Sequence, residues 1–506
     1  MRVALAGVLI GMALLVAPAQ LRPTHFLPDD SYFYLVIAKN IAAGQGSTFH
    51  GITPTNGYHP LWMLCCVAAA RVVGGDKSAL VHLVLAIQFC MTVGTVMLFL
   101  RMVTLLGLRH GWVATPVLAG YFLTGMYGSE AHLNGLCVTS ALVLYVRLAA
   151  SLTRGATSPR TLTWVLLGVS LGLAFLARLD NVFLCVAIGA GAMALPGIPG
   201  TRLRAWGALM MVSSAGLVAI PYLALNWLQF RHLVPISGAI KSGFPDVSIR
   251  MANLGTLGAI VAAGALVAIA YASRPGTPKL LRATLLPMGA GVLAHGLYIV
   301  LFTRPNIPWS WYYVPGVLLL SLLAVIGAER LHELLGARWA RRLTLVVTVL
   351  LALAGISRAW LRYRDPEAAG INRFTVRREV PGERWQIVLA KWMKDHLPPG
   401  SGVFVFDQPG ALAYGSDLRI LPADGLVNDF AYDSEIRVRG TADYLRRHGV
   451  DYYFGPLPSP TGDGDVPITS PRTRMPAGTL HLTRDSMLTR VSAPGWPEMA
   501  LWSLTP

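Results

Sequence analysis

The chain has 506 residues, of which 54% are hydrophobic and only 13% are charged. Average soluble domains carry about 25% charged residues, so most of this chain is not expected to be solvated. The formal net charge of +17 does not indicate a nucleic-acid-binding protein, because Lys and Arg are gathered in short loops between apolar segments, where anionic lipid headgroups are the expected counter-charge.

Repeated apolar runs predict a polytopic α-helical membrane protein with about eleven spans. A further apolar segment, 61–73, is too short to cross comfortably and is predicted to be an interfacial or re-entrant helix. The predicted spans are 3–19, 78–103, 112–127, 131–150, 163–178, 181–197, 207–228, 253–272, 284–303, 311–327 and 343–360.

The first span has a second interpretation. "MRVALAGVLIGMALLVAPA" also resembles a signal peptide, with Ala17 and Ala19 at a possible cleavage site. Cleavage would leave the later topology unchanged. The five cysteines all lie in apolar segments without C-x-x-C spacing, so they are expected to be small buried hydrophobic residues rather than disulfide or zinc ligands.

The distribution of basic residues predicts the orientation. Alternate loops are rich in Arg and Lys, and the positive-inside rule places these loops and the N-terminus in the cytoplasm. A single helix over 163–197 would put Arg178 and Asp180 at mid-membrane, so two short spans joined at "ARLDN" are predicted instead. The basic loops contain Arg109; Arg154 and Arg160; Arg202 and Arg204; Arg274, Lys279 and Arg282; and Arg330, Arg338, Arg341 and Arg342.

The chain changes character near residue 361, where long apolar runs end. "ERWQIVLAKWMKDHL" and "TADYLRRHG" have helical patterns, and "SGVFVFD" and "VDYYFG" are typical of strands. We therefore predict a transmembrane domain over 1–360, with a first external loop at 20–77, and an extracytoplasmic α/β domain over 361–506. Four polar residues near its strand ends are expected to be solvated loop residues: Asp407, Asp424, Asn428 and Asp429.

Adjacent acids, Asp29 and Asp30, follow the first span. Carboxylates at a membrane edge are costly to keep there and are functional candidates. Asp29 could instead cap a helix that starts near Ser31, but one acid is enough for that. Neighbouring side chains at a helix start diverge by about 100°, so the two acids are expected to have different roles.

Other polar residues are predicted to lie on the same external face. Carboxylates, basic groups and aromatic rings together suit acid–base chemistry on a sugar or phosphate ligand. These residues also have ordinary interpretations. The acid could be a solvated loop residue, Arg178 and Asp180 a local ion pair, the lysine an exposed side chain, and the aromatic residues an interfacial belt. The candidate binding residues are Glu130, Arg178, Lys241, Arg304, His59, Tyr312 and Tyr313.

The stretch "DDSYFYLVIAKNIAAGQGSTFHGITPTNGYHPLW" resembles the first external loop of bacterial integral-membrane glycosyltransferases of the GT-C superfamily. Relatives include protein O-mannosyltransferases, the lipid A aminoarabinose transferase, rhizobial galacturonosyltransferases and mycobacterial arabinofuranosyltransferases. Weaker matches are Glu130 in "YGSEA", "NWLQFRHLVPISGAIK" and "WYYVP". Arg178-Leu179-Asp180 matches an Arg-Pro-acid turn loosely, since Leu stands where Pro is usual.

The resemblance implies an enzyme of the bacterial plasma membrane. It would move a sugar from a polyprenyl-phosphate donor to a cell-envelope glycan, lipid or protein on the outer face, with inversion. Asp29 or Asp30 matches the general base by position, and Asp30 is preferred. Some relatives bind a divalent cation, for which Asp29 and Glu130 would be the ligands of Mg²⁺ or Mn²⁺.

Basic groups would stabilise the departing phosphate, and Lys241, Arg304 and Arg178 are the candidates. Two alternative functions remain open at this point. A transporter or flippase of lipid-linked saccharides would also hold charges, but near the membrane midplane and often on repeated helices. A non-catalytic assembly protein would not need the paired acids.

Overall fold

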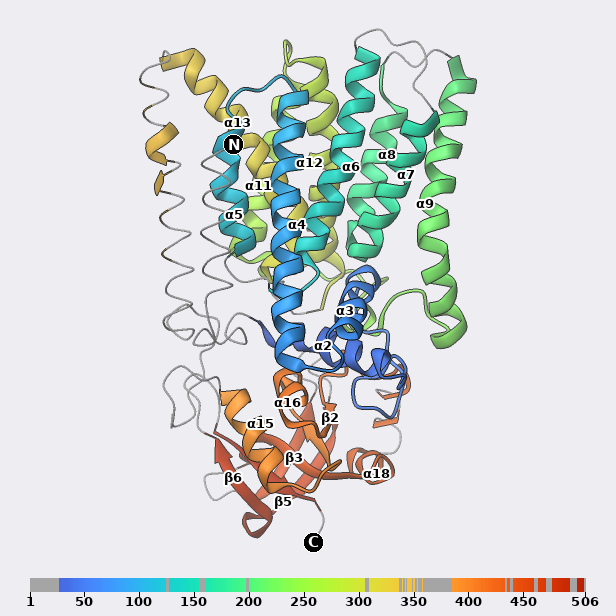
Figure 1. Cartoon of the computed structure of the whole chain (residues 1–506), viewed down its shortest axis with the longest axis vertical. Helices are drawn as coiled ribbons and strands as arrows, with labels where there is room; N and C mark the ends of the chain where they lie inside the picture. Colours follow the sequence, from blue (N-terminus) through green and yellow to red (C-terminus); the bar gives the residue numbers. More distant parts are fainter. Residues whose placement is uncertain are drawn as a thin grey trace.

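The fold is a bundle of apolar helices with a strand-containing region at one end (Figure 1). The predicted span 3–19 and the boundary near residue 361 lie outside the described residues. The computed structural model describes residues 27–123, 127–153, 161–196, 200–304, 309–335, 385–432, 435–436, 440–458, 463–469, 476–491 and 498–504, with scattered positions between 339 and 357.

Six helices of the bundle are long and apolar enough to cross a membrane, which bears out a polytopic helical protein. The span predicted at 343–360 is only partly described, so the described residues do not establish the number of spans. The six are α4 (Lys77–Leu105), α6 (Ala131–Thr153), α9 (Gly200–Phe230), α11 (Gly255–Ser273), α12 (Lys279–Phe302) and α13 (Val314–Leu335). Three shorter apolar helices accompany them, α5 (Ala114–Leu123), α7 (Thr161–Ala177) and α8 (Val182–Met193).

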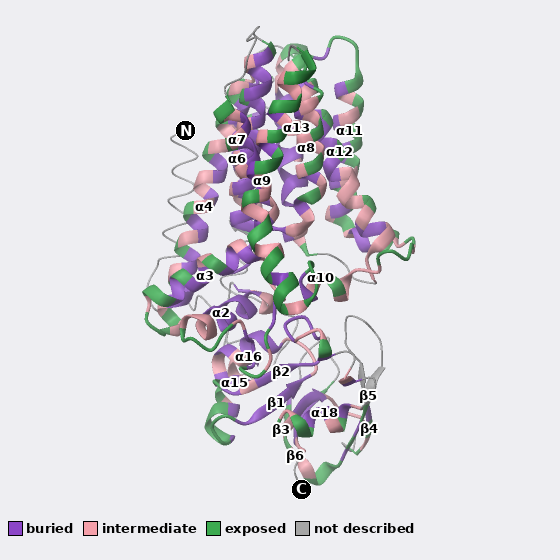
Figure 2. Cartoon of the chain, turned by 90° about the vertical axis from the view of Figure 1, so that its right-hand side faces the viewer, coloured by how far each residue is buried: buried purple, intermediate pink, exposed green. Residues whose placement is uncertain are grey.

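Burial distinguishes the inner helices from the outer ones. Helices α6 and α13 are mostly buried, whereas α9 is mostly exposed along its length (Figure 2). Many of the exposed residues of α9 are large and apolar, among them Val212, Leu217 and Leu225. Such a surface is compatible with lipid but not with water, so α9 belongs to the lipid-facing side of the bundle.

The break predicted at "ARLDN" is confirmed. Helix α7 ends at Ala177, the 3₁₀ turn η3 (Leu179–Asn181) follows, and α8 begins at Val182. The two helices run back along each other, since the Cys185 thiol lies 3.4 Å from the Leu171 carbonyl oxygen. The turn places Arg178 at a helix end instead of inside a span.

Two helices of the first loop lie between the bundle and the C-terminal region (Figure 1). They are α2 (Asp29–Ala42) and α3 (Pro60–Val72). Helix α3 begins with proline, whose missing N–H costs nothing at a first helical position. Its place at the end of the bundle agrees with the interfacial helix predicted over 61–73.

The C-terminal region contains a five-stranded mixed sheet and a separate two-stranded hairpin. The sheet order is β2-β1-β3-β7-β6, in which β1 pairs in parallel with β2 and β3, and β7 pairs antiparallel with β3 and β6. The predicted helices and strands of this region are confirmed. The elements are α15 (Trp385–His396), β1 (Gly402–Val405), α16 (Pro409–Ser416), β2 (Arg419–Pro422), α18 (Thr441–Arg447), β3 (Val450–Pro456), β4 (Gly464–Thr469), β5 (Pro476–Leu482), β6 (Met487–Val491) and β7 (Met499–Ser503).

Strand β1 is buried on both faces, as its continuous apolar run predicts. Val403 and Val405 join a core that contains α15 and α16 and continues into the membrane bundle. Phe404 points to the other side and joins a second core with Tyr444 of α18. The α15–α16 layer therefore lies between the sheet and the bundle.

Some of the expectations about exposure are wrong. Asp424 and Asn428 are not solvated but 2% and 1% exposed, because the loop after β2 packs on the first external loop. A Cβ atom at Gly57 would lie 2.0 Å from the Leu426 carbonyl oxygen, so the two backbones are in direct contact. Among the cysteines, Cys90 is exposed on α4 rather than buried.

Candidate active site

The two adjacent acids, Asp29 and Asp30, lie on different faces of α2. Asp29 and Phe33, one turn apart, face α16, since both lie close to Gly410. Asp30 is one turn before Tyr34, whose hydroxyl donates a 2.9 Å hydrogen bond to Glu130 Oε2. Residues four positions apart share a helix face, so Asp30 belongs to the side of α2 that faces Glu130.

Asp29 does not cap its own helix. Its carboxylate oxygens accept hydrogen bonds from the N–H groups of Gly410 (2.9 Å) and Ala411 (2.8 Å), in the first turn of α16. Helix α2 begins at Asp29 and has no side-chain cap of its own. Asp29 therefore caps a helix, as the sequence suggested, but the helix is α16 and not its own helix α2.

Burial raises the pKa of Asp29 to about 7 from an ordinary value of 3.8. The two N–H donors lower the pKa, and the neighbouring Asp30 and Asp407 raise it, but burial has the largest effect. The folded protein thus holds this proton more tightly than the unfolded chain does. By linkage, stability from the buried group is fully present below about pH 4 and is lost as the pH rises through 7.

This linkage gives a testable pH dependence. Between pH 4 and pH 8, the midpoint of thermal unfolding of the purified protein should fall relative to that of Asp29→Asn, with the decline between about pH 4 and pH 7 and a plateau above pH 7. The neutral amide cannot titrate, so other pH effects cancel in the comparison. Parallel curves for the two proteins would contradict the raised pKa of Asp29.

A buried ion cluster lies next to α2. Arg178 is 3% exposed and forms an ion pair with Glu130 through Nη1. Its Nε and Nη2 atoms donate 2.8 Å hydrogen bonds to the two carboxylate oxygens of Asp180. The local Arg178–Asp180 pair expected from the sequence is present, but it belongs to a larger network that joins the loop before α6 to the turn after α7.

Histidines border the cluster on both sides. His59 Nε2 lies 3.7 Å from Glu130 Oε1, and His295 Nε2 lies 3.3 Å from Asp180 Oδ2. His59 also donates its backbone N–H to the Tyr34 hydroxyl at 3.2 Å. Burial lowers the pKa of His59 to about 4, so this side chain is neutral near pH 7.

Tyr312 connects the ion cluster to a second cationic group. The Arg178 guanidinium lies 4.1 Å from the centre of the Tyr312 ring, and Lys241 Nζ donates a 3.2 Å hydrogen bond to the Tyr312 hydroxyl. Within the described chain, no carboxylate lies within 4.0 Å of Lys241 Nζ. The Arg304 N–H donates to the Lys241 carbonyl oxygen at 2.9 Å, which places the two basic residues side by side.

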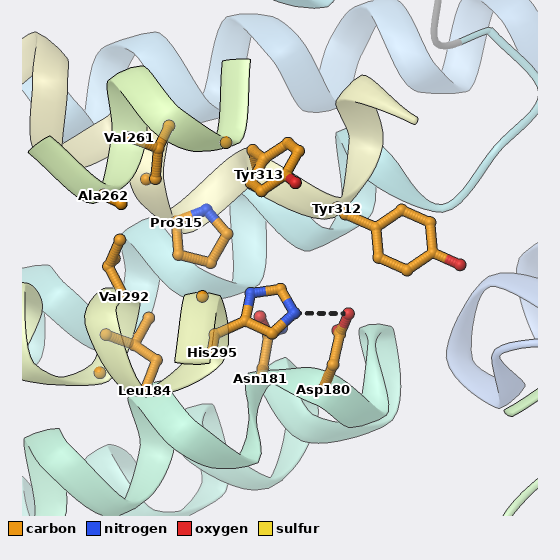
Figure 3. A pocket seen from close by; sticks show the side chains of 14 residues that line it. Asp180, Asn181, Leu184, Val261, Ala262, Val292, His295, Tyr312, Tyr313 and Pro315 are labelled. Atoms are coloured by element: carbon orange, nitrogen blue, oxygen red, sulfur yellow. Dashed lines mark ion pairs between the residues drawn. The ribbon is translucent and has the colours of Figure 1, made fainter. Parts of the chain in front are cut away.

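A small, partly open pocket extends from this cluster into the bundle. Figure 3 shows Asp180, His295 and Tyr312 at one end and apolar side chains such as Val261 and Val292 at the other. Tyr313 also lines the cavity but donates its hydroxyl to the Leu254 carbonyl oxygen at 2.7 Å. The glycines of its wall are Gly258, Gly291, Gly296 and Gly316. The cavity therefore has one polar end and a smooth apolar wall.

Most of the predicted binding residues lie together. Contacts join Glu130, Arg178, His59, Lys241 and Tyr312, with Arg304 and Tyr313 adjacent. Sequence reasoning missed His295 and Tyr34. A lone histidine in the apolar run of α12 is the signal for the first, since polar groups inside spans are rarely accidental. The spacing of four from Asp30 could have found the second.

The proposed Asp29–Glu130 metal site does not fit this arrangement. Asp29 is bound to the N–H groups of α16, whereas Glu130 is already paired with Arg178 and Tyr34. A divalent cation at Glu130 would have to displace a buried guanidinium. In the described part of the chain, no group of three or more His, Cys, Asp and Glu side chains could hold a metal ion, and no metal enters the mechanism proposed below.

Comparison with solved structures shows a similar fold in another protein. The crystal structure of ArnT from Cupriavidus metallidurans in the apo state is similar with a TM-score of 0.53 at 14% identity, over 89% of this chain and 92% of ArnT. The structure of that ArnT bound to undecaprenyl phosphate gives 0.52 at 13% identity, over 95% and 97%. The chain therefore shares the fold of ArnT over most of its length.

Other comparisons are less informative. Arabinofuranosyltransferase AftD from Mycobacteria has a TM-score of 0.44 at 13% identity, and the match covers 40% of AftD. A TM-score of this size is too low to support an inference. A family described as a domain of unknown function (DUF8728) matches residues 375–487 in the C-terminal region. No curated protein matches the sequence.

Proposed function

We propose that this protein is an inverting glycosyltransferase of the bacterial plasma membrane. It moves a sugar from a polyprenyl-phosphate donor to an acceptor hydroxyl of a cell-envelope glycan, lipid or protein on the outer face. One observation carries the proposal: a pocket with an apolar wall in the bundle has Asp180, His295 and Tyr312 at its polar end, and Tyr312 contacts two basic side chains, Arg178 and Lys241. The fold shared with ArnT, a protein solved with bound undecaprenyl phosphate, supports it.

The donor would lie with its apolar chain against the bundle and its phosphate at the polar end of the cavity. Lys241 is the strongest phosphate ligand, because Arg178 is already neutralised by Glu130 and Asp180. Arg304 lies beside Lys241, to which its backbone is hydrogen-bonded, and adds positive charge. Tyr312 holds Lys241 in place through its hydroxyl.

The transfer step uses Asp30 as the general base. The Asp30 carboxylate takes the proton of the acceptor hydroxyl, and the acceptor oxygen forms a bond to the anomeric carbon of the sugar. The bond between that carbon and the phosphate oxygen breaks, and its electron pair leaves with polyprenyl phosphate. Lys241 and Arg178 stabilise the charge on the departing phosphate. Attack opposite the leaving group inverts the anomeric carbon.

The topology supports an extracytoplasmic site. Helices α2 and α3, the ion cluster and the C-terminal region share one end of the bundle (Figure 1), and the Arg-rich loops are predicted to face the cytoplasm. The N-terminus would then be cytoplasmic and the C-terminal region outside.

Turnover tests the assignment directly. Full-length protein in nanodiscs should convert a labelled polyprenyl-phosphate sugar, drawn from a panel of pentoses and hexoses, to polyprenyl phosphate. Sugar should appear in an envelope extract prepared from a strain lacking the gene. Donor movement across vesicles without release of polyprenyl phosphate would instead identify a flippase and overturn the proposal.

Removal of the Lys241 charge should weaken donor binding. Lys241→Met is expected to raise the KM for the donor by roughly 10- to 100-fold, because a hydrogen bond to a charged group contributes about 1.5–3 kcal/mol. Lys279→Met is the control and should leave KM unchanged, because Lys279 is the first residue of α12, whereas Arg304 and its neighbour Lys241 lie at the other end of that helix. Equal donor KM values for Lys241→Met and Lys279→Met would show that Lys241 does not bind the donor phosphate.

A further inference from the structure

Helix α16 of the C-terminal region has strained residues at both ends. Among the described residues, three that are not glycine have a positive φ, and two of these, Gln408 (55°) and Asp417 (61°), flank α16. Such conformations are unfavourable and persist where surrounding contacts impose them. The contacts of α16 are therefore the place to look for a function.

The C-terminal end of α16 is bound to the start of α4. Lys77 forms an ion pair with Asp417 and donates a 2.6 Å hydrogen bond to the Tyr414 carbonyl oxygen. The Tyr414 hydroxyl returns a 2.7 Å hydrogen bond to the Lys77 carbonyl oxygen. Lys39 of α2 adds an ion pair with Asp417 at 3.9 Å, and the Tyr32 and Tyr414 rings are 5.3 Å apart.

The N-terminal end of α16 is bound to the start of α2 through Asp29. The Asp29 carboxylate accepts the Gly410 and Ala411 N–H groups. The backbones also touch, since a Cβ atom at Gly410 would lie 2.4 Å from the Asp29 carbonyl oxygen. We name the contacts that Asp29, Lys39 and Lys77 make with α16 the α16 clamp.

We propose that Asp29 is a positioning residue, which holds the first turn of α2 against α16 and thereby fixes the direction of Asp30. This inference rests on the proposed role of Asp30 as general base. It assigns to the C-terminal region a part in catalysis through α2.

The physical reason is the position of Asp30 in the helix. It is the second residue of α2, whose start has no side-chain cap, and uncapped first turns fray. Asp29 fixes that turn from the neighbouring position. A displacement of about 1 Å at a reacting group can lower the rate roughly 100-fold, so a loose first turn would be costly to transfer.

Two variants test the positioning role by different routes. Asp29→Ala removes the carboxylate, whereas Gly410→Ala keeps both acids and forces α16 away from Asp29. Both should lower kcat by roughly 100-fold with little change in the donor KM, and both should increase hydrogen exchange of the first turn of α2 as well as of α16. Controls are Asp443→Asn, a partly exposed acid of α18 that pairs with Arg447, and Gly327→Ala, where a Cβ atom meets open space.

Several results would overturn the inference. Full transfer by Gly410→Ala would show that contact with α16 does not matter. Loss of transfer in Asp29→Ala without increased exchange in α2 would make Asp29 a chemical participant instead. Increased hydrogen exchange in α16 but not in α2 would show that the α16 clamp only holds the C-terminal region in place and does not position Asp30. Failure of the proposed function is distinguishable, because the unaltered protein would then show no transfer while the exchange result would still hold.

Discussion

Asp30→Asn is expected to lower kcat for sugar transfer by roughly 10²- to 10⁴-fold, the usual contribution of a general base. The amide has nearly the same shape as the carboxylate but cannot accept the acceptor proton. Donor binding does not use Asp30, so the donor KM should stay within a factor of about two. The measurement is release of polyprenyl phosphate by the purified protein under saturating donor.

A parallel measurement on Asp29→Asn tests which of the two acids is the general base. Asp29→Asn keeps one acceptor oxygen for the N–H groups of Gly410 and Ala411, and should lose less activity than Asp30→Asn. Asp443→Asn should behave as the unaltered protein, since Asp443 is partly exposed on α18 and pairs with Arg447. If Asp29→Asn is the more damaged of the two, the assignment of the base to Asp30 is wrong.

Arg178→Gln is expected to have the largest effect on stability. Arg178 is buried between Glu130 and Asp180, and its removal leaves two carboxylates in the interior without a counter-charge. Breaking a buried pair in this way costs about 3–5 kcal/mol. Arg178→Lys should restore only part of the loss, because an ammonium group cannot reproduce the bidentate bonds to Asp180.

The molecule contains a matched control for that prediction. Arg330 and Glu333 form an ion pair at 2.6 Å, but their side chains are 51% and 61% exposed. Exposed pairs contribute about 0–1 kcal/mol, so Arg330→Gln should barely move the midpoint of thermal unfolding. The combined variant Arg178→Gln with Glu130→Gln should cost less than the sum of the single changes. Equal midpoints for Arg178→Gln and Arg330→Gln would contradict the buried network.

Much of the architecture was predictable because it depends on local properties. The length of an apolar run determines whether a helix can span a membrane, which is why α4, α6, α9 and the later long helices were expected. Arg178 and Asp180 are too costly to place at mid-membrane, which predicted the break between α7 and α8. The helix and strand patterns of the C-terminal region are local in the same way.

The composition of the site was predictable, but its geometry was not. Glu130, Arg178, Lys241 and Tyr312 stand out as polar residues at span ends, and the fold brings them together. Nothing local connects His295, inside α12, with Asp180, because that contact depends on how two helices pack. The separation of Asp29 from Glu130 was not predictable for the same reason, since each carboxylate has a different partner.

The sequence alone determined that this is a membrane protein with two acids at the start of an external helix, because composition and hydrophobic run length are properties of neighbouring residues. It also required the two acids to diverge, because a helix turns by about 100° per residue. Which acid faces which partner was decided only by the tertiary structure. Asp29 meets Gly410 across 381 positions of chain, and a contact of that range is set by packing rather than by local pattern.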